Sequence, residues 1–145
     1  MPEHMETVFD QMPELMKSLK RPKYEANMDL FWTNHRPVFD GMAAFVGDAE
    51  DQAGAARNIA ERFVDSVAEK FSVRGELRGR TEADLTFFMI YYVFPAILMT
   101  GHFAARDTAD AIRDEWSARI AKRQINYTDY ESLRKTFREK IWGIF

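Results

Sequence analysis

Residues Thr81 to His102 read TEADLTFFMIYYVFPAILMTGH, and this stretch decides the fold of the chain. Thr81 followed by Asp84 is a short variant of the capping box, which is typical of the start of a helix. From Leu85 to Met99 the stretch is almost wholly apolar, and Gly101 suits the left-handed conformation in which many helices end. A helix that is apolar on every side must be surrounded by other elements. The sequence therefore predicts a central helix from residue 81 to about residue 100.

The same apolar run is too short for a transmembrane helix. Its 15 residues fall below the roughly 20 that a bilayer requires, and they include Thr86 and Pro95. The first residues of the chain, MPEHMETVFDQ, carry early acidic side chains and no apolar core, which is not the pattern of a secretory signal. We therefore expect a cytoplasmic protein that has no membrane partner.

Helical spacing of apolar residues recurs along the rest of the chain. The segments 5–19, 28–46, 56–71, 105–120 and 130–144 all place apolar residues three or four positions apart. Gly47 is expected to end the second of these helices, and Asp48 is expected to cap the next one. Pro13 either kinks the first segment or starts a new short helix, and Pro37 kinks or splits the second.

These apolar stripes need a common partner, which the central helix can supply. We predict an all-α fold, a single helical domain over residues 1–145, in which a bundle of about six helices packs around the central helix at about 81–100. Residues 72–80, SVRGELRGR, read as a surface loop, and no longer linker is present. Thr128 and Glu131 form a capping box at the start of the last helix. Glu115 and Arg119 are expected to form an exposed pair one helical turn apart.

Composition restricts the class of protein. A chain of 145 residues can bury a sizeable core, and 12 Phe and 8 Met supply large and adaptable side chains for it. The net charge of −3 argues against a nucleic-acid partner. Because the sequence has no cysteine, it offers no disulfide, no thiolate metal ligand and no cysteine nucleophile.

The common metal and catalytic motifs are absent from the sequence. The Glu-x-x-His motif of di-iron bundles does not occur, since Trp32 and Met99 stand three residues before His35 and His102. The segment from Asp48 begins like a calcium loop but lacks the glycine and the glutamate that such a loop needs at its sixth and last positions. No phosphate-binding glycine loop or serine elbow occurs. We therefore expect no metal, no cofactor and no catalytic residue, and we rank a haem protein or an enzyme below a binding protein.

Three kinds of polar side chain could still serve a ligand. His35 lies on an apolar stripe, where it could bind a ligand or accept a proton; alternatively, it bonds a backbone carbonyl left open by Pro37. Tyr91 and Tyr92 point about 100° apart, so one of them could orient a ligand, or the hydroxyl could bond a neighbouring backbone group or carboxylate. His102 could line the mouth of a pocket or cap the end of the central helix.

The abundance of Phe and Met exceeds what a minimal core requires. We interpret the chain as a non-enzymatic module that either encloses an apolar small molecule or associates with a second copy of itself. The residues predicted to line the ligand site are Trp32, His35, Phe87, Tyr91, Phe94 and Leu98. The same side chains could instead fill a solid core. The alternative function is a regulator or adaptor that contacts nucleic acid or an acidic protein through the loop Arg74–Arg80.

Overall fold

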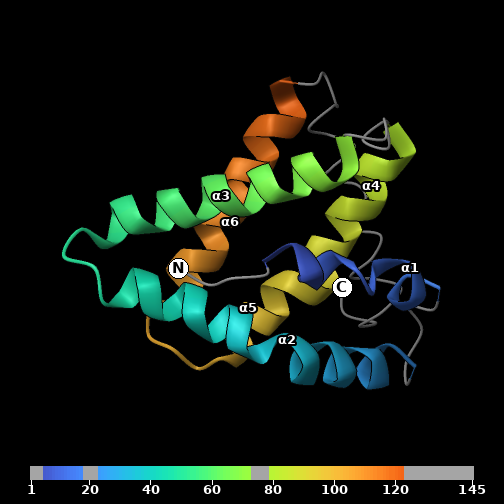
Figure 1. The fold of residues 1–145 in the computed structure, drawn as a ribbon, viewed down its shortest axis with the longest axis horizontal. Coiled ribbons are helices and arrows are strands. Elements are labelled where there is room, and N and C mark those ends of the chain that lie inside the picture. Colours follow the sequence, from blue (N-terminus) through green and yellow to red (C-terminus); the bar gives the residue numbers. More distant parts are fainter. Residues whose placement is uncertain (1–4, 18–22, 73–78, 123–145) are drawn as a thin grey trace, which may run out of the picture.

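The computed structural model describes residues 5–17, 23–72 and 79–122, and every regular element within these ranges is a helix (Figure 1). The elements in chain order are η1 (Met5–Phe9, a 3₁₀ turn), α1 (Met12–Leu15), α2 (Lys23–Gly47), α3 (Gln52–Ser72), α4 (Gly79–Phe88), η2 (Met89–Val93, a π-helical turn), α5 (Phe94–Met99) and α6 (Ala105–Lys122). The all-α prediction is confirmed. The count of about six helices stays a prediction, because the last helix expected from the sequence lies outside the described residues.

The central helix consists of α4, η2 and α5, which follow one another without a break. It begins at Gly79, two residues before the start predicted from Thr81. It ends at Met99, followed by Thr100 and then by Gly101 with a φ of 71°. The predicted glycine stop is therefore confirmed. No helix within the described ranges is both long and apolar enough to cross a membrane.

Most sides of the central helix are buried. Its fully buried apolar and aromatic side chains are Leu85, Phe88, Met89, Tyr91, Tyr92, Val93, Ala96 and Ile97. Each large apolar side chain removed from water contributes roughly 1.5–3 kcal/mol, so this helix supplies a major share of the core energy. The half-buried side chains Phe87, Ile90 and Phe94 follow one another at spacings of three and four, which marks a single less covered side.

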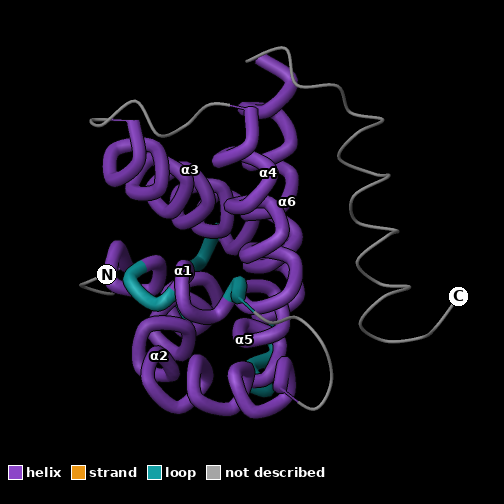
Figure 2. Tube along the Cα trace, turned by 90° about the vertical axis from the view of Figure 1, so that its right-hand side faces the viewer, coloured by secondary structure: helices purple, strands orange, loops and turns teal. Residues whose placement is uncertain are grey.

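The N-terminal segment closes the core between two long helices. Figures 1 and 2 show η1 and α1 lying between α2 and α3. The ring of Phe9 in η1 lies 5.4 Å from the rings of both Phe63 in α3 and Phe88 in α4, measured between centroids. Pro13 lies in the first turn of α1, as one of the two sequence alternatives predicts. One short segment thus joins two helices that are far apart in the chain.

The helix α2 and its connection to α3 test two predictions from the sequence. Of the two alternatives for Pro37, a kink or a split, the split is wrong, because α2 continues from Lys23 to Gly47. The cap of α3 is Asp51 rather than Asp48, since the Gly54 N–H donates to Asp51 Oδ1 at 3.0 Å. A capping carboxylate accepts from an N–H three residues further on, so a helix that begins at residue 52 uses Asp51.

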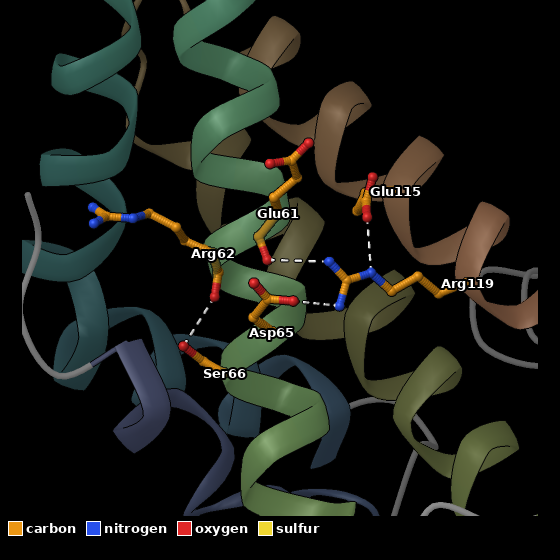
Figure 3. A network of polar contacts seen from close by, with 6 residues as sticks. All are labelled: Glu61, Arg62, Asp65, Ser66, Glu115 and Arg119. Carbon is orange, nitrogen blue, oxygen red and sulfur yellow. Dashed lines mark hydrogen bonds and ion pairs between the residues drawn. The ribbon is translucent and has the colours of Figure 1, made fainter.

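A charged cluster joins α3 to α6 (Figure 3). Arg119 Nε donates to Glu115 Oε1 at 2.8 Å, and Arg119 Nη1 pairs with Asp65 Oδ1 of α3 at 2.6 Å. The predicted Glu115–Arg119 pair is therefore present, but it is three-quarters buried rather than exposed, because Arg119 turns toward α3. Burial lowers the pKa of Arg119, while the hydrogen bonds and charges of the two carboxylates raise it more.

Gly47 permits the close approach of the turn after α5. A methyl group at this position would collide with the His102 ring and come within 3.1 Å of Phe103. We expect Gly47→Ala to lower the free energy of unfolding by about 1–3 kcal/mol, as overpacking does. In a His102→Ala background the same change should be neutral or stabilising, because alanine favours a helix by about 1 kcal/mol over glycine. Urea unfolding measures both, and equal losses in the two backgrounds would contradict the prediction.

Candidate functional site

Five aromatic rings form a cluster where α2 packs against the π-helical turn of the central helix. Its members, the tyrosine cluster, are Tyr24 and Phe31 of α2 and Phe88, Tyr91 and Tyr92 of the central helix. Ring centroids of neighbouring members lie 5.3–6.0 Å apart, and three of the pairs meet edge to face. This spacing is that of aromatic rings in direct contact. The cluster is therefore a packed joint between α2 and the central helix.

The π-helical turn and Pro95 together leave a backbone carbonyl inside this joint without a hydrogen bond from its own helix. The Phe94 N–H bonds the Met89 carbonyl five residues back, instead of four. Pro95 has no N–H, so it cannot supply the bond that an α-helix would give to the Tyr91 carbonyl. The Tyr24 hydroxyl of α2 donates to that carbonyl at 2.5 Å. A side chain from another helix thus satisfies a backbone acceptor that proline leaves open.

The hydroxyl of Tyr92 also bonds a backbone carbonyl. It donates to the Leu15 carbonyl at the end of α1 at 3.0 Å, as the structural alternative for this residue predicts. Burial raises the pKa of Tyr92, and a hydrogen bond with Asn27 partly offsets that rise. Burial also raises the pKa of Tyr24, with smaller contributions from its two tyrosine neighbours. Both groups remain protonated donors across the physiological range.

His35 is buried beneath the N-terminal segment. Its Nε2 lies 3.0 Å from Gln11 Oε1, and its ring lies 5.0 Å from Phe31 between centroids. The described partner is therefore a glutamine side chain, not a carbonyl opened by Pro37. Burial lowers the pKa of His35, and the negative charge of Asp10 opposes this shift. In the neutral tautomer that fits the bond, Nε2–H donates to Gln11.

The six residues predicted to line a ligand site fall in different places. Two of them, His35 and Tyr91, are buried in the core. Trp32 is half-buried and carries the Arg36 guanidinium 5.3 Å from its ring centroid. Phe87 and Phe94 lie half-buried on the less covered side of the central helix, and Leu98 is exposed. The structure links His35 to the tyrosine cluster through Phe31, but it leaves Leu98 at the surface.

The sequence analysis did not anticipate an apolar patch at the end of the central helix. We use the name end patch for Leu98 and Met99 at the end of α5 and Phe103 in the turn that follows, whose exposed fractions are 51, 45 and 72%. The Phe103 ring stacks on the His102 ring at 4.7 Å between centroids. A single large apolar residue in a turn gives no periodic signal in the sequence. What could have shown it is its position two residues after the helix-ending Gly101, in the turn between α5 and α6.

His102 stabilises the start of the next helix instead of the end of the previous one. Its Nδ1 accepts the Ala104 N–H at 3.1 Å, and its carbonyl accepts the Ala105 N–H at 3.0 Å. The side-chain bond of His102 is therefore made at the start of α6, and a cap on the end of the central helix is not among the described contacts.

Within the described ranges, no three His, Asp or Glu side chains lie close enough together to hold a metal ion. The chain matches no family model, no curated protein and no solved structure. Most of the loop Arg74–Arg80 falls outside the described residues, so the adaptor hypothesis keeps only its sequence basis.

The Tyr24 hydroxyl should stabilise the fold because Pro95 leaves the Tyr91 carbonyl without an N–H donor. We expect Tyr24→Phe to lower the free energy of unfolding by about 1–3 kcal/mol, the cost of leaving a buried acceptor unsatisfied. In a Pro95→Ala background the loss should be smaller, since alanine restores an N–H for the Tyr91 carbonyl. Tyr92→Phe is the matched control, because its loss should be the same in both backgrounds. Urea unfolding of the variants measures each term, and a Tyr24→Phe loss unaffected by Pro95→Ala would refute this account.

His35 should make stability depend on pH. In the unfolded chain its pKa is near the ordinary value of about 6.5, while burial holds it lower in the folded protein. As the pH falls below about 6.5, the unfolded chain takes up a proton that the folded chain resists, so the free energy of unfolding falls. His35→Gln should show a shallower decline between pH 7 and pH 5 in denaturant titrations. Identical slopes in the two proteins would show that His35 does not carry the effect.

Proposed function

We propose that this chain is a non-enzymatic helical module that associates with a second copy of itself through the end patch. The observation that carries the proposal is the exposure of Phe103 beside Leu98 and Met99. Large apolar side chains grouped on a surface, rather than scattered singly, mark interaction sites. Burying each of them in a partner contributes roughly 1.5–3 kcal/mol before the cost of association.

The charges around the end patch support a second copy as the partner. Arg106 and Asp107 are both exposed in the first turn of α6, directly after the patch. In a two-fold dimer the same patch faces itself, so an arginine of one copy can meet an aspartate of the other. An apolar centre with both signs of charge at its edge is therefore self-complementary. Because the patch is small, we expect a weak, reversible dimer.

Binding of an apolar small molecule receives less support than self-association. The predicted ligand-site residue Tyr91 packs against Tyr24 within the tyrosine cluster, and the Tyr24 and Tyr92 hydroxyls donate to backbone carbonyls. Rings in contact and committed hydroxyls suit a joint between helices better than a ligand site. We also propose a cytoplasmic location, which the absence of cysteine supports.

The oligomeric state tests the proposed function. Sedimentation equilibrium over a wide concentration range should show a monomer–dimer equilibrium for the chain, and Phe103→Asp should weaken it at least about tenfold by burying a charge. Leu30→Asp is the matched control, because Leu30 of α2 is 52% exposed but belongs to no such patch. It should leave the equilibrium unchanged. A chain that stays monomeric at every concentration, or equal effects of the two variants, would end the proposal.

A further inference from the structure

The N-terminal segment, residues 5–17, is held by the other helices rather than by structure of its own. Its buried apolar side chains are Met5, Val8, Phe9, Met12 and Leu15. Its two regular elements have five and four residues, and helices this short do not persist in water without tertiary contacts. Hydrogen bonds join it to the core, from His35 Nε2 to Gln11 Oε1 at 3.0 Å and from Tyr92 to the Leu15 carbonyl at 3.0 Å. The segment therefore keeps its shape only while it is docked.

The long helices beneath the segment hold one another directly. The pair of Arg119 with Asp65 joins α6 to α3 at 2.6 Å, and the bond from Trp116 Nε1 to Thr86 Oγ1 joins α6 to the central helix at 2.8 Å. The Tyr24 hydroxyl joins α2 to the central helix. None of these three contacts uses the N-terminal segment. They can therefore remain in place when the segment leaves the core.

His35 couples the docking of the segment to pH. Burial of this side chain lowers its pKa, and the negative charge of Asp10 in the segment opposes that shift without cancelling it. Both influences weaken when the segment leaves, so the pKa of His35 returns toward its ordinary value of about 6.5. The open form therefore binds the proton more tightly than the docked form does. Its share rises as the pH falls below about 6.5.

Asp10 is the charged group, among the described residues, that shifts the pKa of this imidazole. Arg36, the next residue of α2, is directed to Asp40 Oδ2 at 3.3 Å. On the central helix the titratable neighbour of the segment is Tyr92, whose raised pKa keeps it neutral. On α3 the ring of Phe63 contacts the segment. The charge state of the imidazole therefore depends on whether the segment is docked.

We propose that the N-terminal segment opens as a unit while the long helices stay packed, and that protonation of His35 favours the open form. Opening withdraws Phe9 from between Phe63 and Phe88, whose ring centroids each lie 5.4 Å from its own. An apolar face of the core is then uncovered more often in mildly acidic than in neutral solution. The segment is thus a pH-sensitive cover, and its opening does not depend on the proposed dimer.

Amide hydrogen exchange of the full chain, followed by NMR, measures the opening. The N–H groups of Leu15 and Met16 make backbone hydrogen bonds of 3.0 and 2.9 Å within the segment, and that of Thr108 makes one of 3.0 Å at the start of α6. The opening constant of each is the observed exchange rate divided by the intrinsic rate at the same pH. It should be at least about tenfold larger for Leu15 and Met16 than for Thr108, because a local opening costs less than unfolding of the long helices.

The opening constants of Leu15 and Met16 should rise by about threefold to thirtyfold when the pH is lowered from about 7.5 to about 5. The upper value holds for an imidazole with a pKa of about 6.5 in the open form that takes up no proton in the docked form. His35→Gln removes the titration but keeps a donor for Gln11, so it should reduce the rise to less than about twofold. His102→Gln is the matched control, and it should keep the full rise.

Each outcome decides the proposal. A larger opening constant for the segment, with a rise that His35→Gln abolishes and His102→Gln keeps, supports it. A rise that persists in His35→Gln, or no rise at all, overturns the control by His35. Equal opening constants for Leu15 and Thr108 overturn the separate opening. If His35→Gln does not fold, Asp10→Asn replaces it: the charge of this exposed side chain opposes the effect of burial, so its removal should enlarge the rise, and an equal or smaller rise overturns the proposal.

Discussion

The packing of α2 on the central helix depends on the backbone acceptor at Tyr91. Pro95 removes one donor from the centre of the most buried helix, and the π-helical turn just before it changes the bonding register. An open carbonyl in an apolar core is costly, so the fold must bring a donor to it. The Tyr24 hydroxyl supplies the donor from a distance of 67 residues along the chain. The requirement positions the first turn of α2, and the remaining rings of the tyrosine cluster pack around that contact.

Local chemistry made the helices predictable from the sequence. The apolar run from Leu85 to Met99 and the glycine stop at Gly101 need no knowledge of neighbouring elements, because periodicity and a positive φ act within a few residues. The start at Gly79 and the choice of Asp51 over Asp48 as a cap were missed. Both the start of a helix and the identity of its cap depend on small free-energy differences between neighbouring residues that could occupy the same position. Such boundaries are the least certain part of any sequence reading.

The contact partners within the candidate sites could not be predicted from the sequence. Nothing in the spacing of Arg119 and Glu115 shows that α3 brings Asp65 to them, and nothing in the sequence around His35 shows that Gln11 meets its ring. These partners come from elements that are distant in sequence, so only the packed structure identifies them. The exposure of Phe103 was missed for a different reason. A turn residue gives no periodic pattern, and its exposure depends on what the surrounding helices leave uncovered.

The position of the N-terminal segment between α2 and α3 has a consequence for the order of folding. Residues 5–17 are the first described part of the chain to be synthesised, yet the Tyr92 hydroxyl that bonds Leu15 is made 77 residues later. Contacts of such long sequence separation form slowly, because the intervening chain must first be closed into a loop. The segment of η1 and α1 therefore gains its full set of contacts only after the central helix is synthesised. Until that point part of its apolar surface lacks a partner, so the nascent chain is more prone to aggregation before the central helix is complete than after it.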